Sequence, residues 1–203
     1  MSNFWLGQDP LVLASASKIR SQILASAGIP HDIVPASVDE RNLENSAQGQ
    51  EGPAIALMLA QAKAESVSAQ KPGRMVLGAD QTLTIASQIF HKPGCRANAR
   101  RQLLSLKGQA HRLNSALALV QGGTLLFATV ISATLTMRNF SEAFLDNYLN
   151  AAGPDIFSSV GCYHIEGIGI HLFDKIDGDQ FTIMGLPLIP LLDHFRNLGL
   201  IIR

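Results

Sequence analysis

The sequence predicts an α/β fold in which a mixed, twisted sheet forms two lobes around a central cleft. Short apolar runs of strand length alternate along the 203 residues with longer amphipathic or alanine-rich runs of helical length. Hydrophobic residues make up 47% of the chain but aromatic residues only 6%, so we expect a core of Leu, Ile, Val and Ala. Because no internal repeat or linker-like segment divides the chain, residues 1–203 are expected to form one domain.

Strands and helices alternate in the first half of the chain, and Gly or Pro marks several of the boundaries. Apolar runs bounded by polar residues predict the strands, and apolar residues at helical spacing predict the helices. The expected elements are, in order, a strand at 11–14, a helix at 17–27 ended by Gly28, a strand at 29–35, a mobile polar loop at 42–52, a long helix from Pro53 to Ala69, and a strand at 75–85 interrupted by residues 78–80.

The second half carries the longest predicted strands. Residues 111–120 and 125–137 read as two antiparallel strands joined at Gly122 and Gly123. The other expected elements are a short strand at 89–91 with a turn at 92–94, a helix at 97–107 ended by Gly108, a helix that Ser141 caps and residues 153–154 end, short strands within 161–185, and a final helix after Pro190.

Composition and charge exclude several classes of protein. Sixteen basic residues balance sixteen acidic ones, which argues against a nucleic-acid-binding protein. Cys95 and Cys162 lie far apart and lack metal-ligand spacing, so a reduced, cytoplasmic protein is expected. The N-terminus does not resemble a signal peptide, and no apolar run reaches the roughly 20 residues that cross a bilayer. We therefore expect neither nucleic acid nor membrane as a partner.

A serine-rich turn after the first strand predicts an anion-binding site. The turn carries Ser15 and Ser17, and the helix that follows carries Lys18 and Arg20. The first N–H groups of a helix lack partners, and the helix dipole adds positive charge at the same end. Hydroxyls, cations and free N–H groups together suit a phosphate group. The alternative is an ordinary amphipathic helix for which Ser17 serves only as the N-cap.

Two acidic positions are candidates for metal binding or acid–base chemistry. Asp39 and Glu40 follow the second predicted strand, where paired carboxylates can bind a hard divalent cation, although a solvated charged loop has the same pattern. Asp80 lies inside an otherwise apolar strand, where an unpaired carboxylate is costly. Gly78 and Ala79 before it leave room for a ligand. The cost of burial therefore indicates a functional partner for Asp80.

The remaining polar motifs are weaker when taken singly. Lys92 lies at a turn that Pro93 fixes and could reach a phosphate, although a lysine in a turn is usually just solvated. His111 begins a strand and is expected to be structural. The other histidines show no spacing that suggests a zinc site.

The order and spacing of these motifs resemble those of the Maf family, which consists of nucleoside triphosphate pyrophosphatases. The resemblance extends from about Leu11 to Gly199. It rests on Leu13–Arg20, Asp39 with Glu40, Gly78–Asp80, Lys92 with Pro93, Gly108 with His111, Val160–Tyr163, and Ile176–Asp179 continuing to Gly185–Pro187. It implies a single two-lobed domain similar to the inosine triphosphate pyrophosphatases, with nucleotide in the central cleft. It also implies hydrolysis to a monophosphate and pyrophosphate with a divalent cation, Mg or Mn, and is compatible with a homodimer.

Matched position by position, the resemblance assigns roles to acidic residues. Asp80 corresponds to the family's catalytic aspartate, which accepts a proton from the attacking water. Glu40 corresponds to an acidic residue that is a metal or water partner. Together these two carboxylates are the implied metal ligands, because Mg and Mn favour oxygen ligands.

The resemblance also assigns the substrate contacts. Lys63, in the long helix, and Lys92 match cations that face the triphosphate. The implied donors and positive charges around the phosphates are Ser15, Ser17, Lys18, Arg20, Lys63 and Lys92. Gln81 resembles the branch of the family that acts on methylated guanosine triphosphate, whereas the thymidine and uridine branch usually has threonine there.

Four positions depart from the family pattern. Lys18 and Ile19 replace a proline and an arginine, and Ser159 replaces a lysine. Glu166 replaces a glutamine, and we still expect it to contact the substrate. A lost cation and a gained anion are expected to weaken polyphosphate binding by Coulomb repulsion, unless a metal ion or Lys18 compensates. Three functions therefore stay open. They are an active pyrophosphatase for modified or pyrimidine nucleotides, a catalytically weakened nucleotide-binding or regulatory protein linked to cell division, and a structural protein without a nucleotide site.

Overall fold

A mixed sheet of seven strands runs through a computed structural model of the chain, which describes residues 4–47 and 49–203. The strands are β1 (Leu11–Leu13), β2 (His31–Ile33), β3 (Met75–Ile85), β4 (Gln88–Phe90), β5 (Ala110–Gln121), β6 (Thr124–Met137) and β7 (Phe173–Asp177). Their order is β2-β1-β3-β5-β6-β7, and β4 pairs with β3. β1 runs parallel to β2 and β3, whereas the other pairs are antiparallel. The expected α/β fold with a mixed sheet is therefore confirmed.

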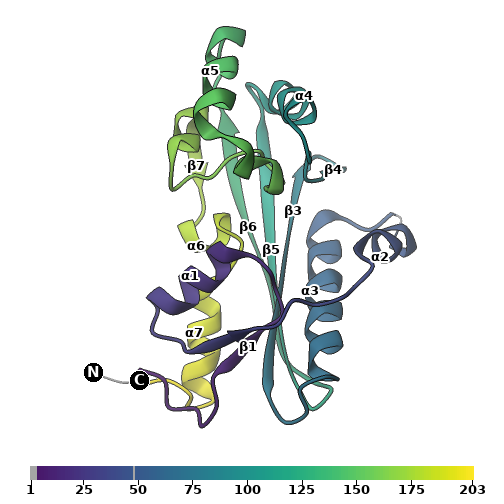
Figure 1. Cartoon of the computed structure of the whole chain (residues 1–203), viewed down its shortest axis with the longest axis vertical. Coiled ribbons are helices and arrows are strands. Elements are labelled where there is room, and N and C mark those ends of the chain that lie inside the picture. The colour runs from purple at the N-terminus through teal and green to yellow at the C-terminus, as the bar shows by residue number, and fades with distance from the viewer. Residues whose placement is uncertain (1–3, 48) are drawn as a thin grey trace.

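Helices cover both faces of this sheet (Figure 1). They are α1 (Lys18–Ser26), α2 (Glu40–Ser46), α3 (Gly52–Ser68), α4 (Arg96–Leu106), α5 (Glu142–Ala152), α6 (Gln180–Ile183) and α7 (Leu188–Asn197), with 3-10 helices η1 (Pro154–Ser158) and η2 (Ile168–Leu172). α3 packs on one face of the sheet, and α1 and α7 pack on the other. Within the described residues, no helix is both long and apolar enough to cross a membrane.

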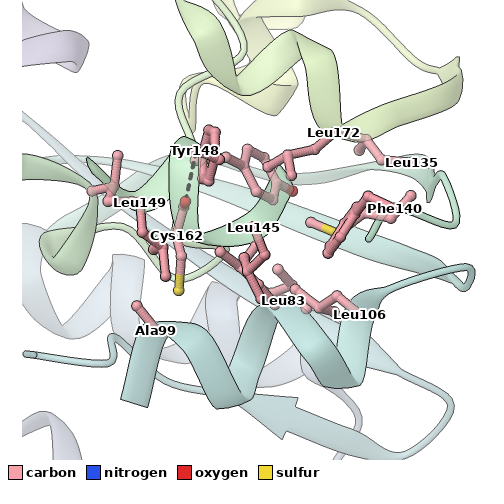
Figure 2. Close-up of a cluster of buried hydrophobic side chains, with 14 of the residues drawn as sticks. Leu83, Ala99, Leu106, Leu135, Phe140, Leu145, Tyr148, Leu149, Cys162 and Leu172 are labelled. Carbon is pink, nitrogen blue, oxygen red and sulfur yellow. Dashed lines mark hydrogen bonds between the residues drawn. The ribbon is translucent and has the colours of Figure 1, made fainter. Parts of the chain in front are cut away.

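A separate hydrophobic core lies at the far end of the long strands, beneath α4 and α5 (Figures 1 and 2). Leu83 of β3 packs there with Leu106 of α4 and Leu145 of α5. The Tyr148 hydroxyl donates a hydrogen bond of 2.9 Å to the carbonyl of Cys162. This bond ties the segment after η1 to the cluster, which we call the upper core. A lower core lies between the sheet and helices α1 and α7, so the upper and lower cores correspond to the two expected lobes.

The expectation of a mobile loop at 42–52 is wrong for its first part. Residues up to Ser46 belong to α2, because the Asp39 side chain caps the helix by accepting a hydrogen bond of 3.1 Å from Asn42 N. Leu43 then packs against a small buried cluster that contains Ile55 and Leu59. Residue 48 of the expected loop lies outside the described residues. The cap at Asp39 and the apolar contact of Leu43 thus stabilise α2 despite the polar composition of this segment.

Three further expectations need correction. β3 is continuous through residues 78–80, because the Asp80 carboxylate finds a cation and the ladder with β5 is kept. The segment 161–185 holds η2 and α6 as well as one strand, β7. The last helix begins at Leu188, since Pro190 lies in the first turn, where its missing N–H removes no helical hydrogen bond.

α3 approaches β3 so closely at Gly78 that no side chain fits there. A Cβ on Gly78 would lie 2.0 Å from the carbonyl oxygen of Ala60 and 2.8 Å from the nitrogen of Ala64. Ala60 and Ala64 are fully buried and present only methyl groups to the sheet. The contact therefore depends on small residues from both elements, and it lies beside Lys63 on the helix and Asp80 on the strand.

Gly78→Ala is expected to destabilise the protein by about 3 kcal/mol, because the added methyl group forces the helix backbone away from the sheet. Urea unfolding followed by circular dichroism measures the change. Gly167→Ala is the matched control, since a Cβ there meets nothing nearer than 3.8 Å. Equal stability of the two variants would show that α3 can shift at no cost.

Candidate active site

One cleft of about 1240 Å³ lies between the lower lobe and the segment after η1. It is bounded by the turn after β1, by α2, α3 and β3, by the turn after β4, and by the segment from 158 to 166. Ten of the site residues expected from the sequence line it, whereas Asp39, expected beside Glu40 as a metal ligand, does not line it and caps α2 instead. The ten residues are Ser15, Ser17, Lys18, Arg20, Glu40, Lys63, Asp80, Gln81, Lys92 and Glu166. The fold therefore brings together residues that are as far as 151 positions apart.

Lys63 joins the two acidic residues at the centre of the cleft. Its ammonium group lies 2.8 Å from Glu40 Oε1 and in hydrogen-bond contact with Asp80 Oδ1. The side chains of Lys63 and Asp80 are each only 12% exposed, whereas that of Glu40 is 49% exposed. Burying the Asp80 carboxylate without such a partner would be costly. The cation that the sequence requires for Asp80 is therefore Lys63, 17 residues earlier on α3.

Charges across the cleft act on Glu40. Partial burial raises the pKa of Glu40, but the hydrogen bond from Lys63 and the charges of Lys63, Lys92 and Arg20 together lower it further. The net pKa lies below the ordinary glutamate value. Glu40 is therefore an anion at neutral pH, and the three cations lie near enough to the site to affect its titration.

The donor set of the cleft suits a divalent cation that is held partly by phosphate oxygens. Lys63 engages one oxygen of each carboxylate, Oε1 of Glu40 and Oδ1 of Asp80. Among residues 4–47 and 49–203, no cluster of three or more His, Cys, Asp or Glu forms a cage for a metal. Two carboxylates fit a Mg ion, which is commonly bound by one or two carboxylates plus substrate phosphates.

The turn after β1 has the expected N-cap. The Ser17 hydroxyl accepts a hydrogen bond of 3.5 Å from Arg20 N, and the Ser15 hydroxyl accepts one of 3.3 Å from Ser17 N. Lys18 is exposed at the edge of the cleft. The N-cap interpretation is confirmed, and the same turn lines the cleft as the anion-site interpretation requires.

Arg20 points into the protein. Its Nη1 donates hydrogen bonds to Ser15 Oγ at 3.0 Å and to the Ala79 carbonyl at 2.7 Å, and its Nε donates one to the Gly185 carbonyl at 2.8 Å. Burial lowers the pKa of the guanidinium, and the charges of Asp80 and Glu40 oppose that shift without cancelling it. Arg20 therefore connects the β1 turn, β3 and the chain after α6, and its charge lies near enough to Asp80 and Glu40 for them to affect its pKa.

Gln81 of β3 and Ser115 of β5 lie on the face of the sheet opposite to Asp80, and the motif reasoning missed Ser115. The Gln81 amide contacts Ser115 of β5, which is fully buried and lies next to Asn114. Ser115 did not feature among the expected site residues. Two adjacent polar residues inside the otherwise apolar strand from Leu113 to Val120 were the signal that could have identified it.

Lys92 and Glu166 mark the outer walls. Lys92 is exposed just after β4, and Glu166 is exposed on the segment that the upper core holds in place. Ser159 lines the cleft, and its hydroxyl donates a hydrogen bond of 3.1 Å to the Tyr163 carbonyl. The wall opposite Lys63 thus combines a locally bonded loop with an acidic side chain.

A family model and close relatives in sequence place the chain in one family. A family model described as Maf-like protein matches residues 10–198. The chain is 52% identical over 194 residues to a nucleoside triphosphate pyrophosphatase of Rhodopseudomonas palustris (strain BisB18), covering 95% of this chain and 96% of the relative. It is 48% identical over 195 residues to a 7-methyl-GTP pyrophosphatase of Mesorhizobium japonicum, covering 95% and 98%. A solved HAM1 protein of Coxiella burnetii aligns with a TM-score of 0.42 and 16% identity, over 63% of this chain and 72% of that one.

Lys63→Met is expected to raise the pKa of Glu40 and to destabilise the protein by about 3 kcal/mol, because Asp80 is left as an unpaired buried carboxylate. Lys63 lowers the pKa of Glu40, so their attraction is fully present above the ordinary glutamate pKa and is lost as the pH falls through the lowered value. Carbon-13 NMR titration of the glutamate carboxyl groups measures the shift, and urea unfolding measures the stability.

The control for this variant is Lys71→Met, which removes an exposed lysine beyond the end of α3. It should leave both measurements unchanged. An unshifted Glu40 titration in Lys63→Met would mean that the contact between the two side chains does not form in solution.

Proposed function

The chain belongs to the Maf-like family, and from this premise we propose that it hydrolyses nucleoside triphosphates to nucleoside monophosphates and pyrophosphate. The observation that carries the proposal is the buried Asp80 carboxylate, which Lys63 holds at the centre of a cleft with further cations around it. The relatives from Rhodopseudomonas and Mesorhizobium, which are named as pyrophosphatases, support the same reaction class.

In the proposed reaction, a water oxygen forms a bond to the α-phosphorus while the bond from that phosphorus to the β-bridging oxygen breaks. Asp80 takes the proton from the water, and pyrophosphate leaves with the electron pair of the broken bond. Lys63 holds the Asp80 carboxylate in place through their ion pair, so the carboxylate is positioned to accept the proton. Lys18 and Lys92, both exposed at the edge of the cleft, oppose the negative charge that develops on the phosphate oxygens.

We further propose that Glu40 and Asp80 hold a divalent cation, Mg or Mn, through their remaining oxygens. Such an ion supplies charge neutralisation at the phosphate oxygens of the substrate. Glu40 suits this role because its pKa is lowered, so that its carboxylate is ionised at neutral pH. Half exposure of its side chain also leaves it accessible to a ligand in the cleft.

For the base, we propose a modified purine, 7-methylguanine, in preference to a pyrimidine. Methylation at N7 gives the ring a positive charge, and Glu166 offers a negative charge on the cleft wall away from the Lys63 centre. The relative from Mesorhizobium, which is named 7-methyl-GTP pyrophosphatase, supports this choice. The acidic side chain that would repel a polyphosphate thus serves to attract a cationic base.

Asp80→Asn is expected to lower kcat by about 10³-fold, because the base that accepts the proton is lost. Pyrophosphate release from a panel of standard and methylated triphosphates, with Mg and with Mn, measures the effect. Asp174→Asn, at an exposed position on β7, is the control and should keep full activity. Saturable nucleotide binding without pyrophosphate release by the wild type would instead support the binding-protein alternative.

Glu166→Gln is expected to reduce the preference for 7-methyl-GTP over GTP by about fivefold, which is the effect of removing one exposed charge near a cationic ring. The ratio of kcat/KM for the two substrates measures this preference. Asp193→Asn on α7, another exposed acidic residue, should leave the ratio unchanged. An unaltered ratio in Glu166→Gln would remove the charge argument for the base.

A further inference from the structure

The cleft wall that carries Glu166 is a segment without helix or strand. Residues 159–166, which we call the wall segment, lie between η1 and η2 and form only turns and irregular backbone. Most of them line the cleft. Backbone of this kind has no sheet ladder or helical hydrogen bonds to hold it. The position of the wall segment therefore depends on bonds from side chains elsewhere in the fold.

The chain enters the upper core in the middle of the wall segment and then leaves it. Residues 161–163 are buried, whereas His164 and Glu166 are exposed at the cleft. Cys162 has a φ of 58°, in the left-handed region that side chains rarely adopt. The Tyr163 ring covers Gly161 so closely that a Cβ there would lie 2.2 Å from Tyr163 Cε1. Such a turn is unfavourable by itself and persists only where its surroundings fix it.

Side chains from α4, α5 and β5 hold this turn. The Tyr148 hydroxyl of α5 donates to the Cys162 carbonyl (Figure 2), and a side chain of α4 contacts a second carbonyl of the wall segment. The sheet contributes His111 of β5, whose Nε2 lies 2.8 Å from Tyr163 Oη. Among residues 4–47 and 49–203, this is the only hydrogen bond between the wall segment and a strand.

The bond between His111 and Tyr163 joins two neutral groups inside the protein. Only 1% of His111 is exposed, and burial lowers its pKa to about 4, so the imidazole is neutral at neutral pH. Phe173 of β7 lies against both rings. The other titratable groups of the upper core are Tyr148 and Cys162, and burial raises their pKa values as it does that of Tyr163. All of these groups are therefore uncharged at neutral pH.

We propose that His111 is a positioning residue that attaches the wall segment to the sheet through Tyr163 and thereby fixes the place of Glu166 relative to Asp80. The bond is part of the structure, whereas its effect on a nucleotide rests on the proposed function. β5 pairs with β3, the strand of Asp80, so one hydrogen bond connects the two walls of the cleft. Its loss loosens the wall of Glu166 and leaves the ion pair of Lys63 and Asp80 intact.

Tyr163→Phe tests the proposal by removing a single oxygen atom. KM for 7-methyl-GTP should rise about fivefold with kcat within about twofold of wild type, because Glu166 is displaced while Asp80 keeps its partner. The ratio of kcat/KM for 7-methyl-GTP to that for GTP should fall by about the same factor. A merely structural bond predicts lower stability with an unchanged ratio.

His111→Leu and His111→Gln separate the hydrogen bond from the space that the side chain fills. A glutamine amide reaches about as far as the imidazole Nε2 and can donate to or accept from the Tyr163 hydroxyl, whereas leucine can do neither. His111→Leu should lower the ratio as Tyr163→Phe does, and His111→Gln should restore it. In a Glu166→Gln background, His111→Leu should change the ratio no further, because His111 acts through Glu166.

The pH dependence of Tm gives a readout that needs no substrate. Because the pKa of His111 is lowered to about 4, its neutral form stabilises the fold above the ordinary histidine pKa. This contribution is lost as the pH falls through the lowered value. Glutamine does not titrate, so the Tm of His111→Gln should fall less than that of wild type between neutral pH and about 4.

His171→Leu is the matched control, since it removes an exposed histidine of η2 in the same lobe. It should change neither the ratio nor amide hydrogen exchange at residues 160–166. Tyr163→Phe should make that exchange about tenfold faster, the effect of losing about one buried hydrogen bond. An unchanged ratio in Tyr163→Phe overturns the proposal, whether or not the exchange is faster. If the wild type hydrolyses no triphosphate or does not prefer 7-methyl-GTP, the proposed function fails, and the exchange still decides whether the bond holds the wall segment.

Discussion

The geometry of the cleft depends on the close contact between α3 and β3 at Gly78. With no side chain at this position, the carbonyl of Ala60 and the nitrogen of Ala64 lie against the strand. Lys63 follows within the same helical turn, and Asp80 lies two residues along the strand on the same face. A lysine side chain therefore reaches the carboxylate directly, and it also reaches Glu40 on α2. A wider separation between helix and sheet would leave Asp80 buried and unpaired, which is among the most destabilising arrangements in a protein.

The order of the strands assembles the rest of the site around that pair. β1 lies parallel to β3 and next to it, so the turn after β1 ends beside the middle of β3, where Asp80 lies. Arg20 connects the two elements, because it donates hydrogen bonds to Ser15 in the turn and to the Ala79 carbonyl on the strand. β3, β5 and β6 continue into the upper lobe, where the Tyr148 hydroxyl holds the segment that carries Glu166 (Figure 2). One sheet thus supports both walls of the cleft.

The residues that the sequence singled out line one cleft, but the sequence did not show what each one contacts. Asp80 stood out because a carboxylate in an apolar strand needs a partner, and that reasoning predicted its environment correctly. The helix α2 could not be predicted, because its stability comes from the Asp39 cap and from the contact of Leu43 with α3. The inward direction of Arg20 and the contacts of Gln81 could not be predicted from the sequence either. Their acceptors, Gly185 and Thr182, lie 165 and 101 residues away, and local patterns contain no information about such contacts.

The charges of the cleft give an electrostatic reason for the proposed cation. Among the described residues that line it, five are basic and five are acidic: Lys18, Arg20, Arg41, Lys63 and Lys92 against Glu40, Glu44, Asp80, Asp155 and Glu166. Arg20 and Lys63 are already engaged with carbonyl or carboxylate oxygens of the protein itself. A triphosphate therefore enters a cleft with no net excess of positive charge. An added cation would offset its several negative charges in this partly buried site, and the divalent ion that we propose between Glu40, Asp80 and the phosphates would supply that charge. The replacement of a family lysine by Ser159 strengthens this reason, whereas Lys18 offsets the charge of the arginine that Ile19 replaces.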